Sequence, residues 1–189
     1  MTLALILEAS HKTYTVEEYF EFEKHSEIRH EFVDGKVIAM PGELLPNIEI
    51  SQNCFRTISD LFEDKGCETY IFNAKMAVNI NNRYRYPDVV VTCEHEPDLR
   101  MIQFPSLVVE VLSEGTQHVD KGDKLREYQS MPTVQYYLLV ASDSIQVTLY
   151  SRIGKNWQEE MFKTADDSVP LPFFDTNLPL KKIYKGLNF

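Results

Sequence analysis

The chain has 189 residues, 43% of them hydrophobic and 12% aromatic, which is enough to bury the core of one compact domain. Its 29 acidic residues against 19 basic ones give a formal net charge of −10, which excludes a general polyanion-binding surface unless basic groups gather on one face. The apolar stretch "LALILEAS" is too short to span a membrane and lacks the features of a secretory signal, so we expect no membrane segment.

Three cysteines, Cys54, Cys67 and Cys93, show no close pairing and no metal-ligand spacing. A chain of this length does not need disulfides to hold its core. We therefore expect each cysteine to be a small buried or half-buried residue in a protein of the reducing cytoplasm.

The first elements in chain order are a helix and a hairpin. Thr15 followed by Glu18 is a capping-box pattern and predicts a helix over 15–25. The dipeptide "DG" at 34–35 lies between two strand-like runs and predicts a tight hairpin. Glu31 falls on the first strand of that hairpin.

The rest of the chain alternates between helical and strand patterns. We expect a second helix at 47–63, strands at 68–80, 85–93 and 106–113, and a third helix at 118–130. The runs "VQYYLLV", "SIQVTLY" and "WQEEMF" predict further strands. With no linker or repeat, this order predicts one α/β domain over residues 1–189, in which a central mixed β-sheet is flanked by helices.

Two carboxylates lie on the strands that we expect at the centre of the sheet. Asp88 opens the apolar run in "YPDVVV", and Glu110 interrupts the apolar run "LVVEVLS". If the two strands pair, these like charges could meet at one point and recruit a cation, for which Mg²⁺ or Mn²⁺ is the simplest choice. Two alternatives stay open: Asp88 as a turn or cap residue, and Glu110 in a structural ion pair with a lysine.

The third predicted helix carries basic residues. Lys121, Lys124 and Tyr128 fall on one side of it by helical spacing, so at least one lysine should face the sheet. The alternative is that both lysines form solvated surface pairs with their acidic neighbours.

Taken together, the segments "HEFVDGKVIAMPG", "YPDVVV", "SLVVEVLSEGT" and "DKGDKLREY" resemble a bacterial family of restriction-endonuclease-like proteins within the PD-(D/E)xK nuclease superfamily. The resemblance runs from about Tyr14 to Tyr150, and the motifs keep the order and approximate spacing of the family. It implies a restriction-endonuclease-like core over these residues and a metal-dependent nuclease activity.

The resemblance also implies roles for single residues. Asp88 and Glu110 match metal ligands, and the backbone carbonyl of Val111 is expected to complete the metal site. Glu31 matches an N-terminal acidic residue that adds a ligand or positions a water. The family lysine matches Lys124 on the helix that follows.

Three positions depart from the common pattern of the superfamily or the family. Leu112 occupies the position where the superfamily lysine normally lies, and Lys121 is a second candidate for that lysine. Asn47 stands where the family often has a histidine. The segment at 135–137 is Gln-Tyr-Tyr instead of Glu-Tyr-Trp, a change that we expect to affect packing only.

The resemblance implies hydrolysis of phosphodiester bonds in nucleic acid, with DNA as the expected substrate and a homodimer as the expected assembly. A local basic strip could offset the acidic net charge if folding gathers its members: Arg83, Arg85, Lys121, Lys124 and Arg126. The competing hypothesis is a catalytically inactive nuclease fold that binds nucleic acid or a protein partner.

Overall fold

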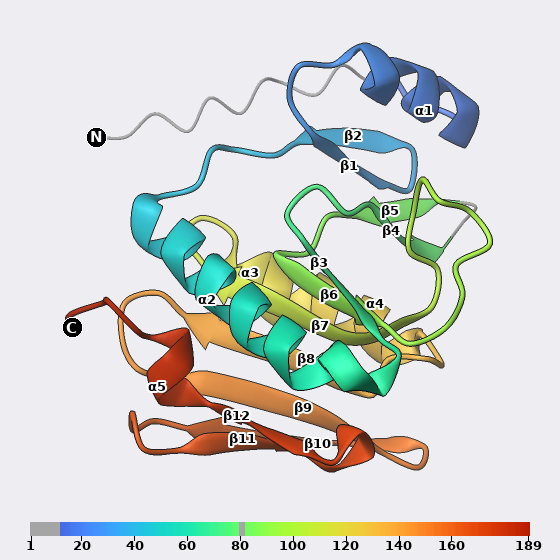
Figure 1. Cartoon of the computed structure of the whole chain (residues 1–189). Helices are drawn as coiled ribbons and strands as arrows, with labels where there is room; N and C mark the ends of the chain where they lie inside the picture. The colour runs from blue at the N-terminus through green and yellow to red at the C-terminus, as the bar shows by residue number, and fades with distance from the viewer. Residues whose placement is uncertain (1–11, 80–81) are drawn as a thin grey trace.

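The computed structural model describes residues 12–79 and 82–189, so the N-terminal run "LALILEAS" and the last residue of the strand expected at 68–80 lie outside the described part. Helices and strands alternate through this part (Figure 1). In chain order the elements are α1 (Val16–His25), β1 (His30–Val33), β2 (Lys36–Ala39), α2 (Leu45–Phe62), η1 (Glu63–Lys65), β3 (Glu68–Ile71), β4 (Met76–Asn79), β5 (Arg83–Arg85), β6 (Val89–Thr92), β7 (Pro105–Leu112), α3 (Gln117–Val119), η2 (Asp120–Lys124), α4 (Leu125–Ser130), β8 (Tyr136–Ala141), β9 (Val147–Ile153), β10 (Asn156–Phe162), β11 (Ser168–Leu171), η3 (Pro172–Phe174), β12 (Thr176–Pro179) and α5 (Leu180–Ile183).

A six-stranded mixed sheet forms the centre of the molecule, in the order β10-β9-β8-β7-β6-β3. β7 and β8 are parallel, and the other neighbours are antiparallel. The parallel pair requires a crossover, which α3, η2 and α4 supply. The predicted α/β fold with a central mixed sheet and flanking helices is confirmed.

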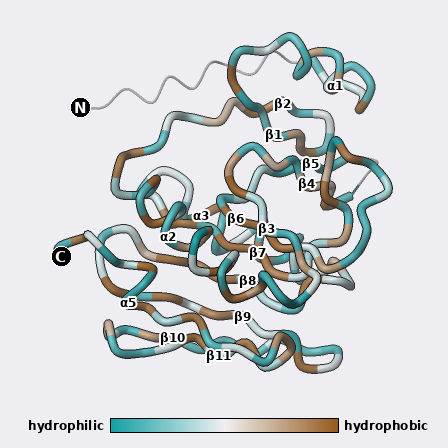
Figure 2. The backbone as a smooth tube through the Cα atoms, in the orientation of Figure 1, coloured by the Kyte–Doolittle hydropathy of each residue, from teal (hydrophilic) through white to brown (hydrophobic). Residues whose placement is uncertain are grey.

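The side chains of β7 alternate between two apolar layers. Val109 packs with α2 on one face of the sheet, whereas Val108 packs with α4 on the other. Figure 2 shows the hydrophobic segments gathered at β6, β7 and β8, between the layers. Glu110 is two positions after Val108, so the same alternation directs its carboxylate toward the α4 side.

A second sheet of four strands, in the order β2-β1-β5-β4, lies beside the first. Phe32 and Tyr84 pack with Tyr19 of α1 on one of its faces. Because side chains alternate along a strand, the neighbouring residues Glu31 and Arg85 point to the opposite face. That face borders the site described below.

The strands expected at 68–80 and 85–93 are each divided between the two sheets. Phe72 breaks the first with a positive φ of 56°, and its N–H donates to the carbonyl oxygen of Asp88. Pro87 breaks the second, because proline cannot donate to a strand ladder and restricts the residue before it. Asp88 therefore begins the return into the central sheet.

The predicted local signals at the N-terminus are confirmed. Thr15 and Glu18 form the reciprocal hydrogen bonds of a capping box at the start of α1. Asp34 and Gly35 have φ values of 49° and 86°, which the hairpin turn between β1 and β2 requires.

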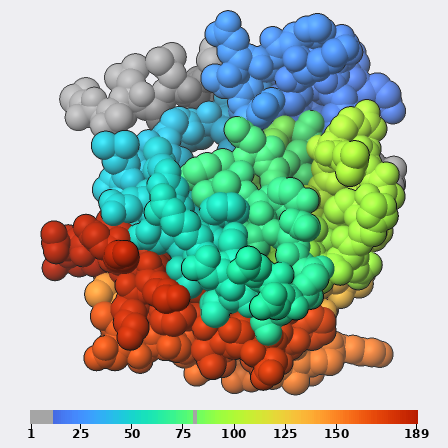
Figure 3. Space-filling view, in the orientation of Figure 1, coloured from blue at the N-terminus to red at the C-terminus, as the bar shows by residue number. Residues whose placement is uncertain are grey.

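The helix expected at 118–130 is present over 117–130, but a π-helical turn lies within it. It consists of α3, the π-helical turn η2 and α4. The C-terminal segment, whose elements the sequence patterns do not predict, forms β11, η3, β12 and α5 and packs against α2 (Figure 3). Asn53 of α2 fixes it by donating to the carbonyl oxygens of Ile183 and Lys185 at 3.0 and 2.9 Å.

The expected burial of the cysteines is confirmed, since Cys54 is buried and Cys67 and Cys93 are half-buried, but the expectation of no pairing is wrong for two of the three. Cys67 and Cys93 form a disulfide, whereas Cys54 is a buried free thiol. β3 and β6 pair with Glu68 opposite Thr92, which brings the flanking cysteines face to face although 26 positions separate them. Disulfides persist mainly in oxidising compartments, so the cysteines do not support a reducing one.

No helix in the described ranges is both long and apolar enough to cross a membrane.

Candidate active site

A cavity of about 240 Å³ is lined by residues of both sheets and of the crossover between β7 and β8. Its charged lining comes from segments that are far apart in the sequence: Glu31, Glu43, Arg85, Asp88, Glu110, Asp120 and Lys124. The four residues expected to be catalytic all line this cavity, together with Val111.

Glu110 receives two side-chain donors from the crossover helix. Lys124 Nζ lies 3.0 Å from its Oε1, and the hydroxyl of Tyr128 donates to the same oxygen at 2.9 Å. The residue is only 4% exposed. Burial raises the pKa of Glu110 well above its ordinary value, and the charge of Lys124 opposes that rise.

Lys124 is surrounded by three carboxylates. Besides Glu110, its Nζ lies 2.9 Å from Asp120 Oδ1 and 3.6 Å from Glu31 Oε1. Burial alone would lower the pKa of Lys124, but these negative charges outweigh it and raise the pKa well above the ordinary value. The ammonium therefore stays charged at neutral pH.

Asp88 lies directly before β6, and its Oδ2 accepts a hydrogen bond from the backbone N–H of Val111 at 2.7 Å. This bond joins the two central strands at the cavity. Burial raises the pKa of Asp88 to about 6, although the Val111 bond and the charge of Lys124 pull it down. The negative charges of Glu43 and Asp120 add to the rise.

Glu31 is fixed by a buried arginine of the neighbouring strand. Arg85 Nη1 donates to Glu31 Oε2 at 2.7 Å, and its Nε and Nη2 donate to the two oxygens of Glu127 at 2.9 and 2.8 Å. Burial works against the charged form of Arg85, yet the bonds to Glu127 and the charge of Glu31 raise its pKa. Glu31 thus lies between two cations, Arg85 and Lys124.

Asp120 and Glu43 line the cavity although the sequence did not single them out. Asp120 precedes Lys124 by four residues, and that helical spacing was the available signal. Glu43 precedes α2, and Asn47, the position of the family histidine, donates to its Oε2 at 3.1 Å. Burial raises the pKa of Glu43, and the bond from Asn47 opposes that rise.

The basic strip expected beside the site does not form. Arg83 bonds to Asp34 and Glu127, and Arg126 pairs with Asp123. Lys121, the second candidate for the family lysine, is exposed and donates to the side chain of Gln117. Local carboxylates engage Arg83 and Arg126, and an amide oxygen engages Lys121. Of the five strip residues, only Arg85 and Lys124 line the cavity.

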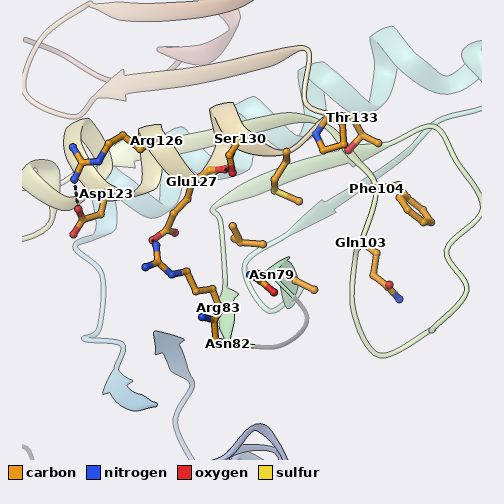
Figure 4. Close-up of a pocket in the computed structure, with 14 residues that line it drawn as sticks. Asn79, Asn82, Arg83, Gln103, Phe104, Asp123, Arg126, Glu127, Ser130 and Thr133 are labelled. Carbon is orange, nitrogen blue, oxygen red and sulfur yellow. Dashed lines mark hydrogen bonds and ion pairs between the residues drawn. The ribbon is translucent and has the colours of Figure 1, made fainter. Parts of the chain in front are cut away.

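A second, larger cavity of about 700 Å³ lies on the other side of Glu127, between the β4–β5 hairpin and the end of α4. Figure 4 shows Glu127 and Arg83 pointing toward one another, and Arg126 pointing toward Asp123. Its two cations and two carboxylates pair internally. The residues expected to be catalytic line the smaller cavity and not this one.

A sequence model described as "Putative restriction endonuclease", that of the Uma2 family, matches residues 16–181. The chain belongs to the Uma2 family. It is 33% identical over 177 residues to uncharacterized protein slr1290 of Synechocystis sp. (strain ATCC 27184 / PCC 6803 / Kazusa), covering 92% of each chain. It is 28% identical over 159 residues to uncharacterized protein sll1609 of the same organism, covering 81% of this chain and 89% of that protein.

A solved structure shares the fold of this Uma2 chain. It is the crystal structure of a putative nuclease belonging to DUF820 from Anabaena variabilis ATCC 29413. The TM-score is 0.74, and the match covers 89% of this chain and 96% of the other at 19% sequence identity. The restriction-endonuclease-like architecture is therefore shown, and the family supports a nuclease-like function.

Restriction-endonuclease-like nucleases generally use divalent metals, and such a cation needs oxygen donors at the cavity of this Uma2 chain. Among residues 12–79 and 82–189, no group of three or more His, Cys, Asp or Glu side chains is arranged to hold a metal. Mg²⁺, however, is commonly bound by only one or two protein carboxylates and keeps its waters. Asp88 and Glu110 supply two in one cavity, and the oxygens Asp88 Oδ1 and Glu110 Oε2 accept no hydrogen bond from the described residues. The donor set fits a hard divalent cation.

Proposed function

We propose that this protein is a metal-dependent nuclease that hydrolyses phosphodiester bonds, with DNA as its substrate and Mg²⁺ or Mn²⁺ as its cofactor. The observation that supports it most strongly is the convergence of Asp88, Glu110 and Lys124, from three separate segments, on one cavity. The acidic pair and the lysine are the groups that this chemistry uses.

Asp88 and Glu110 are the proposed metal ligands, with the backbone carbonyl of Val111 as a further ligand. A divalent cation held there would polarise the phosphate, lower the pKa of a bound water and stabilise the leaving oxygen. Lys124 presents a charged ammonium beside Glu110, where it can orient the attacking water or stabilise charge that develops on the phosphate.

Glu31 has a supporting role in this proposal. Arg85 holds one of its carboxylate oxygens, and the other lies 3.6 Å from the ammonium of Lys124. Glu31 can thus orient a water at the cavity or keep the lysine turned toward it. The same arrangement limits Glu31 as a direct metal ligand, because both oxygens already face cations.

The protein carries a formal net charge of −10, whereas its proposed substrate is a polyanion, so the two repel each other at long range. With the expected basic strip absent, attraction to the phosphate backbone must come from the bound cation and from Lys124. We therefore expect weak DNA binding without metal and a shallow salt dependence with it, because few phosphates are neutralised by protein cations. The homodimer remains part of the proposal, and light scattering of the purified protein tests it. A cytoplasmic location also remains part of it, although the disulfide between Cys67 and Cys93 is of a kind that persists mainly in oxidising compartments.

The experiment is a cleavage assay with supercoiled and linear DNA and with single-stranded RNA, in the presence of Mg²⁺ or Mn²⁺. We expect metal-dependent cleavage of DNA by the wild type and its loss in Asp88→Asn and Glu110→Gln, which keep the side-chain shape. Asp123→Asn changes an exposed carboxylate of the crossover and serves as the matched control. Cleavage retained in both site variants would rule the proposal out.

A second function is favoured by one observation, the buried ion pair between Lys124 and Glu110. The internal ammonium already neutralises Glu110, as expected in a nuclease fold that has lost its chemistry and serves as a binding or assembly module. Such a module should keep its partner in Asp88→Asn and Glu110→Gln and should bind no Mn²⁺ in a calorimetric titration.

A further inference from the structure

The π-helical turn at Asp120–Lys124 interrupts the crossover helix directly beside the site. A π-turn widens the helix and shifts its backbone hydrogen bonds, and such turns are rare and frequently lie at functional sites. Here the buried Tyr137 of β8 supports the wide turn, because its hydroxyl donates to the carbonyl oxygen of Asp120 at 3.0 Å. The central sheet thus holds the backbone of Asp120 in place.

The side chain of Asp120 is held as firmly as its backbone. It is 2% exposed, and its Oδ2 accepts a hydrogen bond from the hydroxyl of Thr116 at 3.1 Å. That hydroxyl lies 2.8 Å from Ser113 Oγ, just after β7. The other oxygen, Oδ1, lies 2.9 Å from Lys124 Nζ and has no hydrogen-bond partner in the described ranges. Since a buried carboxylate oxygen needs a partner, Oδ1 depends on the ammonium of Lys124 to compensate its charge.

The three carboxylates around Lys124 differ in what else they contact. Glu110 Oε1 is shared with the hydroxyl of Tyr128, and Glu31 is shared with Arg85 and lies farther away, at 3.6 Å. Among the residues that the structure describes, Asp120 Oδ1 is ion-paired with the ammonium and accepts no hydrogen bond from another group, and it belongs to the same turn of the chain. Asp120 can therefore hold Lys124 in the cavity even when the oxygens of Glu110 are engaged elsewhere.

We propose that Asp120 is a positioning residue: anchored by Thr116 and Tyr137 on the π-turn, it fixes the Lys124 ammonium at the site. Its meaning for catalysis rests on the nuclease function proposed above. The claim that Asp120 places Lys124 is independent of that function, because the position of Lys124 can be measured in a protein that cleaves nothing.

The first test is reductive methylation of the whole protein with formaldehyde and borohydride, followed by mass spectrometry of each lysine. In the wild type, buried Lys124 should react at least tenfold more slowly than exposed Lys121, three residues earlier on the same turn. In Asp120→Asn, which keeps an acceptor for Thr116 but loses the charge, Lys124 labelling should rise at least tenfold while Lys121 labelling stays constant. Asp123→Asn is the matched control and should change neither.

Tyr137→Phe is a second variant, which keeps the carboxylate of Asp120 but removes the donor to its carbonyl oxygen. It should also raise the labelling of Lys124, and circular dichroism establishes that both variants are folded. If Lys124 stays as protected in Asp120→Asn and Tyr137→Phe as in the wild type, the proposal is overturned.

If the wild type cleaves DNA, Asp120→Asn should lower kcat by about 10²- to 10⁴-fold, the usual contribution of a positioned proton-transfer or charged group. KM and the affinity for Mn²⁺ should change less than threefold, a separation that a general loss of structure would not give. Unchanged kcat would overturn the proposal. If the wild type cleaves nothing, the nuclease function fails, and the labelling of Lys124 alone decides the role of Asp120.

Discussion

Lys124 Nζ lies 3.0 Å from Glu110 Oε1, and this contact joins the crossover helix to the central strand at the cavity. The strand glutamate is thus neutralised by a lysine that follows it by 14 positions. A buried ion pair of this kind adds little to the free energy of unfolding relative to two apolar side chains of similar size. The loss of one partner, however, leaves a buried charge unpaired and destabilises the protein.

Replacing Lys124 with Met should therefore destabilise the protein strongly. We expect the free energy of unfolding to fall by about 3–5 kcal/mol, because Glu110 and Asp120 lose their shared cation. Urea titration at pH 7.5 measures it. The double variant Lys124→Met with Glu110→Gln should recover part of this loss, and strictly additive effects would show that the two side chains do not interact.

The difference in stability between the wild type and Asp88→Asn should depend on pH, because burial raises the pKa of Asp88. Its folded pKa of about 6 lies above the unfolded value of about 3.9. A raised carboxyl pKa destabilises the folded state at pH above 6, and this penalty disappears as the pH falls through 6 to below 4. Asp88→Asn should thus be more stable than the wild type at pH 8, by about 2–3 kcal/mol at 1.36 kcal/mol per pKa unit, and should have no such advantage at pH 4.

The measurement compares the free energy of unfolding of wild type and Asp88→Asn across this pH range. Using the difference between the two proteins removes the contribution of the other titrating groups. A difference that stays constant from pH 4 to pH 8 would show that Asp88 ionises with an ordinary pKa.

Arg85 should tolerate no replacement by lysine. Its planar guanidinium bonds to both oxygens of Glu127 and to Glu31, an arrangement that a single ammonium cannot reproduce. We expect Arg85→Lys to lower the free energy of unfolding by about 2–4 kcal/mol. Arg126→Lys, at an exposed pair with Asp123, is the control and should change stability by less than about 1 kcal/mol.

Tyr128→Phe removes one of the two donors to Glu110 without opening a cavity. The cost should be about 1–3 kcal/mol, because a buried acceptor keeps only Lys124. Chemical denaturation gives the value. A neutral effect would indicate that water replaces the hydroxyl.

Much of the site could be predicted from the sequence because its residues lie on strongly patterned elements. Glu110 interrupts an apolar strand, and alternation along β7 directs it toward the helix that carries Lys124. Local signals also sufficed for α1 and the first hairpin. The choice between Lys121 and Lys124 required the structure, because the π-turn changes the helical phase between them.

Features that depend on tertiary pairing could not be predicted in this way. The disulfide between Cys67 and Cys93 follows from the register of β3 against β6, which no local pattern encodes. The division of two expected strands between two sheets arises at Phe72 and Pro87, where the backbone turns within a β-rich sequence. The partners of Arg85 likewise come from β1 and α4, far away in the chain.

The most direct test of the central claim is a crystal structure of the protein soaked in Mn²⁺, with anomalous scattering used to locate the ion. We expect an anomalous peak bonded to oxygens of Asp88 and Glu110, with Lys124 still in contact with Asp120. An empty cavity at saturating Mn²⁺, with Lys124 unchanged against Glu110, would contradict it.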